Sequence, residues 1–107
     1  MNYFLANYQQ SKTELNIITD TGNTIASKEV ELSDKDYVKQ LAKEIIELSH
    51  EYDLYHNDLN GIGLVIKDFK DIHYTSEASL ISDLESTFGF KAVVDSDSES
   101  LISTLTK

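Results

Sequence analysis

The stretch that most constrains this chain is residues 60–69, which read NGIGLVIKDF. Its apolar residues form an almost continuous run, and two glycines mark places where the backbone must pack closely. A strand buried on both faces has this pattern, whereas a strand with one solvated face alternates apolar and polar residues. A long helical pattern precedes the run and a shorter one follows it, so we expect it to be the first strand of a parallel set.

The residues before this strand predict an antiparallel meander and a helix. Strand patterns cover residues 3–8, 13–19 and 24–31, and the sequence DTGN at 20–23 supplies a turn between the last two. Ser33 is expected to cap a helix that runs to about Tyr52, with Asp36 completing an acidic capping box. Spacings of three and four then place one apolar seam on this helix, formed by Val38, Leu41, Ile45, Leu48 and Tyr52.

The residues after the central strand predict a loop, two helices and one more strand. Residues 70–76 are expected to form the loop, and a helix follows at 77–88 with Gly89 as its C-terminal stop. A short strand at 91–95 precedes a last helix, which Ser96 or Asp97 should cap.

This order of elements predicts a single α/β domain covering residues 1–107. Because connections between parallel strands are almost always right-handed, the simplest mixed sheet has five strands in the order 3-2-1-4-5, with helices on both faces. That order is the ribonuclease H-like arrangement, which also forms the core of each lobe in actin-like ATPases. A chain of 107 residues is long enough for one such core and too short for two.

The charge and composition narrow the functional classes. A formal charge of −10, from 19 acidic residues against nine lysines and arginines, should repel phosphate backbones, so we expect no direct nucleic-acid binding. Cysteine is absent, which excludes a thiol nucleophile and a thiolate metal site. The sequence shows no apolar run long enough for a membrane span and no signal-peptide pattern, and we therefore expect a cytoplasmic protein that does not contact membranes.

Three segments together resemble the ROK family of bacterial sugar kinases and sugar-responsive repressors. NGIGLVIKDF resembles the family's GIGI-x-x-PG strand, and GFKAVVDSDSESLIS at 89–103 resembles its G-(L)-P-V-x-V-x-N-D-A-N-x-A-A segment. Residues 3–32 resemble the family's G-x-D-I-G-G-T turn and the strand that follows it. The resemblance implies the N-terminal lobe of an actin-like ATPase fold within a larger protein, most like a regulator of the xylose-repressor type.

The same resemblance indicates which residues carry function. It places Asp97 on the catalytic aspartate position and Ser96 on the asparagine before it, so these two are the expected ligand-binding residues. The glycine-rich turn that lets backbone amides approach ATP phosphates is degenerate, and its positions hold Asn7, Gln9, Gln10 and Ser11. Glutamine side chains would occupy the phosphate space, so we expect no phosphoryl transfer, no cofactor and no metal.

The same residues are open to other interpretations. Asp97 is also well placed to be a simple helix cap between Asp95 and Glu99. A calcium loop starting at Asp95 would need Gly and Glu where Ser100 and Thr106 stand. A ribonuclease H-type nuclease needs a carboxylate on the first strand, where the chain has an asparagine, so that activity is rejected.

The sequence therefore predicts the sugar-sensing lobe of a ROK-type transcriptional repressor of carbohydrate use, without catalysis of its own. Its expected partners are a sugar, bound in the full-length protein, and a second copy in a homodimer. Two alternatives stay open: a diverged or truncated sugar kinase, and a stand-alone protein-interaction domain.

Overall fold

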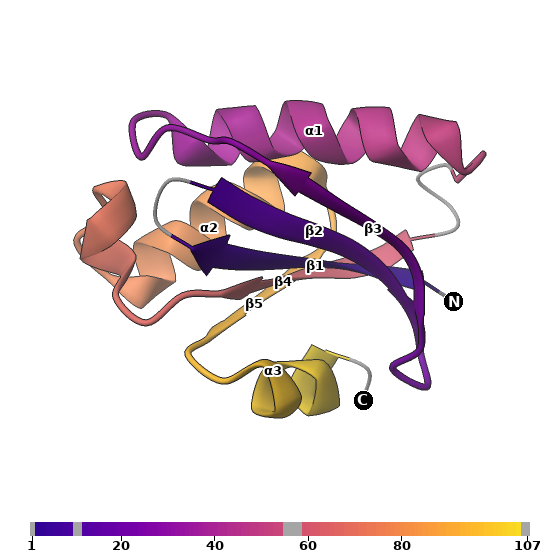
Figure 1. The fold of residues 1–107 in the computed structure, drawn as a ribbon. Coiled ribbons are helices and arrows are strands. Elements are labelled where there is room, and N and C mark those ends of the chain that lie inside the picture. The colour runs from indigo at the N-terminus through magenta and orange to yellow at the C-terminus, as the bar shows by residue number, and fades with distance from the viewer. Residues whose placement is uncertain (1, 10–11, 55–58, 106–107) are drawn as a thin grey trace.

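The computed structural model describes residues 2–9, 12–54 and 59–105, and these residues build one five-stranded sheet (Figure 1). The strands are β1 (Asn2–Gln9), β2 (Lys12–Thr19), β3 (Thr24–Val30), β4 (Leu59–Val65) and β5 (Lys91–Asp95). Their order in the sheet is β3-β2-β1-β4-β5. The first three pair antiparallel, while β1, β4 and β5 run parallel. The predicted topology is confirmed.

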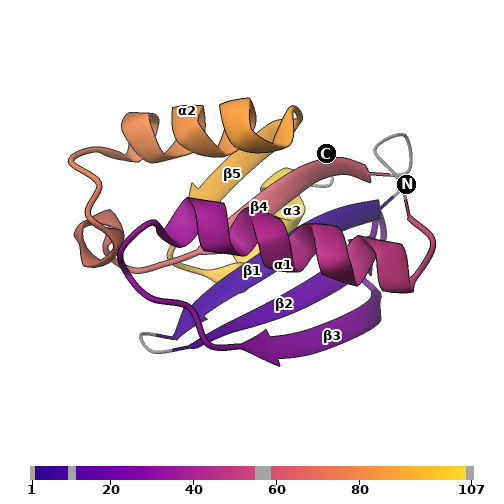
Figure 2. The same cartoon turned by 90° about the horizontal axis from the view of Figure 1, so that it is seen from above.

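Helices cover both faces of the sheet, as predicted. Helices α1 (Tyr37–Glu51) and α2 (Glu77–Phe88) lie on one face, and α3 (Ser98–Leu105) lies on the other (Figure 1). Seen from above, α1 crosses the sheet and α2 lies beside β5 (Figure 2).

Among the described residues, no helix has the length and apolar character that crossing a membrane requires.

Strand β4 is buried on both of its faces, which explains its apolar sequence. Ile62 and Leu64 are fully buried in the larger core cluster, between the sheet and α1 and α2. Val65 belongs to a second cluster on the opposite face, together with Leu101 of α3. A side chain at Gly63 would place its Cβ only 2.1 Å from a methyl carbon of Leu101, so the glycine allows α3 to pack directly on the strand.

The start of α1 differs from the prediction. The helix begins at Tyr37, and its N-cap residue Asp36 has a left-handed backbone (φ 56°) and makes no side-chain cap. The Ser33 hydroxyl instead accepts a hydrogen bond from the backbone N–H of Lys35. The Gln40 side-chain oxygen accepts a hydrogen bond from the backbone N–H of Ser33, the donor that Asp36 would have satisfied in a capping box. The Gln40 amide nitrogen donates to the backbone C=O groups of Ser33 and Lys35, which holds the preceding loop.

Two further elements differ from the sequence-based expectation. Tyr52, placed in the apolar seam of α1, follows the end of the helix and is 48% exposed. Residues 69–72, expected to begin in the central strand and continue into a loop, form the 3₁₀ helix η2 (Phe69–Ile72), because β4 ends at Val65. The Asp68 carboxylate accepts a hydrogen bond from the Lys70 N–H and caps this turn, which buries Ile72.

Helix α2 has the bounds that the sequence predicts. The Ser76 hydroxyl accepts a hydrogen bond from the Ser79 N–H at its start. Gly89 ends the helix with φ 77°, a left-handed conformation that glycine adopts without the cost a Cβ would impose.

Candidate functional site

A cleft of about 420 Å³ lies where the parallel strands end. Strands β1, β4 and β5 are parallel, so their carboxyl ends share one edge of the sheet, the edge at which open α/β sheets bind ligands. The residues that line the cleft are Asn7, Tyr8, Gln9, Val65, Ile66, Lys67, Asp71, Ser96, Asp97 and Ser98.

A second cavity of about 350 Å³ adjoins this cleft and shares three residues with it, Ile66, Lys67 and Ser96. The residues that line only the second cavity are Phe69, Glu77, Val94 and Asp95. We call the two cavities together the carboxyl-edge cleft.

The structure brings the predicted site residues together. Asn7 and Gln9 come from the end of β1, while Ser96 and Asp97 follow β5, and all four line the same cleft. The predicted positions Gln10 and Ser11 lie outside the described residues. The last pair of the β1–β2 hairpin is Gln9 with Lys12.

Asp97 caps α3 and lines the cleft at the same time. One of its carboxylate oxygens, Oδ2, accepts a hydrogen bond of 3.0 Å from the backbone N–H of Ser100. The Asp95 carboxylate accepts hydrogen bonds from the backbone N–H groups of Ser96 and Asp97, which fixes the turn between β5 and α3. The capping role of Asp97 is therefore confirmed, and the cap holds its side chain beside the cleft.

Tyr8 is a cleft residue that the sequence did not reveal as functional. Its hydroxyl donates a 2.7 Å hydrogen bond to Oδ1 of Asp34, in the segment before α1. Its ring packs edge-on against Tyr37, with ring centroids 5.5 Å apart. Burial and the hydrogen bond to Asp34 raise the pKa of Tyr8 above its ordinary value.

Tyr37 anchors this arrangement from the core. Its hydroxyl is hydrogen-bonded to the hydroxyl of Thr13 within the buried interior. Burial raises the pKa of Tyr37 to about 12, although the hydrogen bond to Thr13 acts in the opposite direction. Because side chains alternate between the two faces of a strand, the sequence of β1 predicts that Tyr8 lies on the same face as Phe4 and Ala6, which α1 covers. The contacts of Tyr8 with Asp34 and Tyr37 are visible only in the folded structure.

The cleft presents hydrogen-bonding groups of several kinds. It offers the carboxamides of Asn7 and Gln9, serine hydroxyls, the carboxylates of Asp71 and Asp97, and the ammonium group of Lys67. The chain contains no arginine, the side chain that binds phosphate with two parallel hydrogen bonds. Among residues 2–9, 12–54 and 59–105, no group of three or more His, Asp or Glu side chains is arranged to hold a metal ion.

Sheet order and helix placement define a ribonuclease H-like lobe of the kind found in actin-like ATPases. No protein-family model matches the sequence, and no curated protein matches it. Solved structures do match, and they include members of the ROK family.

Three of these structures illustrate the similarity. A ROK family transcriptional regulator, a homologue of the E. coli MLC protein, has a TM-score of 0.63 at 12% identity, over 88% of this chain and 27% of its own. A candidate N-acetylmannosamine kinase from Listeria monocytogenes has a TM-score of 0.62 at 14% identity, over 89% of this chain and 35% of its own. A ROK family protein from Streptococcus pneumoniae in complex with sucrose has a TM-score of 0.56 at 12% identity, over 89% of this chain and 34% of its own.

These comparisons establish the fold and its extent. The chain spans between 27% and 35% of the length of the three structures described above. Kinases and a regulator occur among the neighbours, so the fold is compatible with either class.

Proposed function

We propose that this chain is the first lobe of a ROK-type, cytoplasmic regulator of carbohydrate use, of the xylose-repressor kind. In this proposal the carboxyl-edge cleft binds a sugar, and no phosphoryl group is transferred. The observation that carries the proposal is the juxtaposition of Asn7 and Gln9 with Ser96 and Asp97 in one cleft.

The chemistry of these groups suits a polyol. Sugar hydroxyls both donate and accept hydrogen bonds, and carboxamides such as Asn7 and Gln9 offer both functions in return. The Asp97 carboxylate accepts from a hydroxyl, and an ionised acceptor makes a stronger hydrogen bond than a neutral one. The cap on α3 holds this carboxylate in place before a ligand arrives, which lowers the entropic cost of binding.

The same positions argue against kinase chemistry. Phosphoryl transfer depends on backbone amides and a metal that position the nucleotide phosphates. In the resemblance to ROK kinases, Asn7 replaces the acid that organises magnesium, and Gln9 replaces a glycine of the phosphate turn. A diverged kinase remains the second candidate because Asp97 borders the cleft, as the catalytic base of a kinase would. A stand-alone protein-interaction domain is the third candidate.

The proposal predicts different responses to sugar and nucleotide. In a titration followed by amide NMR spectra, xylose or glucose should shift the resonances of residues 7–9 and 96–98. Magnesium-ATP should shift none of them, because no glycine turn admits its phosphates.

The Asn7→Ala variant is the control for this experiment. Micromolar binding of magnesium-ATP that disappears in this variant would favour the kinase. If neither sugar nor nucleotide perturbs these amides, the cleft is not a ligand site and the interaction domain gains support.

A second expected result concerns DNA. A chain with a net charge of −10 should not shift any duplex in a gel at physiological salt, because phosphate neutralisation supplies most nonspecific affinity. In the proposed regulator, DNA contacts belong to another segment of the protein. A salt-sensitive shift produced by the purified chain alone would contradict this assignment.

A further inference from the structure

The carboxyl-edge cleft has an excess of negative charge. Its single cationic side chain among the described residues is Lys67, and four carboxylates accompany it, those of Asp71, Glu77, Asp95 and Asp97. Four negative charges against one positive charge leave a local net charge of −3. This sign matters because charges beside a partly desolvated ligand are screened less than charges in bulk water.

Helix termini reduce this excess without reversing it. Glu77 begins α2 and Ser98 begins α3, and the two residues line the two parts of the cleft. Each helix N-terminus contributes the equivalent of roughly half a positive charge. The two together offset about one of the three excess negative charges, so the cleft retains a negative potential.

The carboxylates surround the cleft without forming a metal site. The described residues contain no group of three or more His, Asp or Glu side chains that could hold a cation. Two of the carboxylates, those of Asp95 and Asp97, already accept hydrogen bonds from backbone N–H groups. A dispersed set of this kind acts through its field on an organic cation that also makes hydrogen bonds, and it does not supply the close oxygen shell that magnesium or calcium requires.

From this distribution of charge we infer that the cleft prefers a sugar that carries a protonated amine, and that it rejects the phosphate ester of the same sugar. The inference rests on the proposed function, since it specifies which sugar the same cleft takes. The carboxamides and hydroxyls of the cleft meet the sugar hydroxyls, while the amine lies among the carboxylates. A phosphate would meet those carboxylates with one lysine and no arginine to offset them.

Three sugars of matched shape test the inference: glucosamine, glucose and glucose 6-phosphate. The affinities should be measured by amide NMR titration at about pH 6, below the pKa of an amine of this type. At low salt, glucosamine should bind about tenfold more tightly than glucose, and glucose 6-phosphate should bind more weakly than either. Added salt should reduce the advantage of glucosamine, because it screens the carboxylates.

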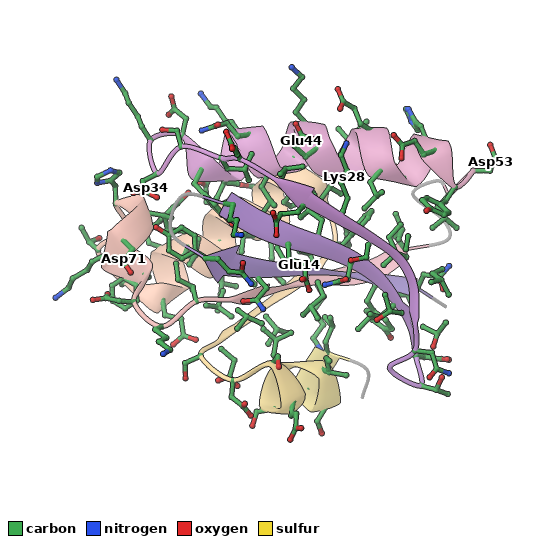
Figure 3. The ribbon with its side chains drawn as sticks, in the orientation of Figure 1. Glu14, Lys28, Asp34, Glu44, Asp53 and Asp71 are labelled. Atoms are coloured by element: carbon green, nitrogen blue, oxygen red, sulfur yellow. The ribbon has the colours of Figure 1, made fainter. Side chains whose placement is uncertain are left out.

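Two variants with the same change in net charge separate the field of the cleft from the charge of the whole chain. Asp71 lies at the cleft, and Asp53 lies at the opposite end of the molecule, beyond α1 (Figure 3). Both side chains are exposed, and each can be replaced by the isosteric asparagine. Asp71→Asn should reduce the advantage of glucosamine over glucose by roughly threefold, and Asp53→Asn should leave it unchanged.

The possible outcomes test the preference for an amino sugar separately from the proposed sugar-binding function. Glucose binding as tightly as glucosamine, or glucose 6-phosphate binding most tightly, would overturn the amine preference and leave a sugar cleft in place. An equal effect of the two variants would also overturn it, since the preference would then come from the overall charge. If none of the three sugars perturbs residues 7–9 or 96–98, the proposed function is wrong and the inference falls with it.

Discussion

Replacing Leu64 with alanine should lower the free energy of unfolding by about 2 to 5 kcal/mol. Leu64 lies on β4, between β1 and β5, and is fully buried in the core beneath α1 and α2. The substitution removes three buried carbons and leaves a cavity that the surrounding strands and helices cannot close completely. A domain of this size has only about 5 to 15 kcal/mol of total stability, so the variant should unfold at a much lower denaturant concentration.

Ile25 on β3 provides the matched comparison. Its side chain is 46% exposed, on an edge strand, so Ile25→Ala should cost less than about 1 kcal/mol. Denaturant melts of the two variants give the contrast directly. Equal losses, or a larger loss at Ile25, would show that β4 is not the centre of the cooperative core.

Much of this fold follows from patterns that are local in the sequence. A strand buried on both faces must be apolar at consecutive positions, and β4 has that pattern because helices cover both of its sides. The bounds of α2 follow from a serine cap and a terminal glycine, both of which act through backbone groups only a few residues away.

The error at the start of α1 arises because a side chain several residues along the chain bonds the backbone of the preceding loop. Ser33 and Asp36 have the residue types of a capping box, but Gln40, the fourth residue of α1, makes the hydrogen bonds that hold the preceding loop. That loop then enters the helix through a left-handed residue, so the helix begins later than the pattern indicates. Cap preferences of single residues do not show that the Gln40 side chain will bond the backbone of Ser33 and Lys35.

The candidate site was predictable in part for a geometric reason. Carboxyl ends of parallel strands meet at one edge, so Asn7 and Asp97 had to approach each other once the strand order was known. Lys67 and Asp71 reach the same cleft because β4 ends at Val65 and a 3₁₀ helix follows. The sequence pattern extended that strand to residue 69, which hid the contribution of this segment.

A second large effect is expected at Gly63, where α3 packs on β4. In Gly63→Ala the new Cβ would lie 2.1 Å from Cδ2 and 3.1 Å from Cγ of Leu101. Leu101 is fully buried, so its side chain has little room to rotate away, and α3 must shift from the sheet. Overpacking of this kind should cost about 1 to 3 kcal/mol, measured as the loss of stability in denaturant melts.

A double-mutant cycle identifies the cause of that loss. Leu101→Ala alone should cost about 2 to 5 kcal/mol, because it removes a buried side chain from the smaller core cluster. It also removes the atoms that the methyl group of Gly63→Ala would strike, so the double variant should be more stable than the sum of the two losses implies. Additive losses would mean that Gly63 is sensitive for a reason other than its contact with α3. A coupling energy of about 1 kcal/mol or more between the two substitutions would establish that α3 can pack on this face of the sheet because Gly63 has no side chain.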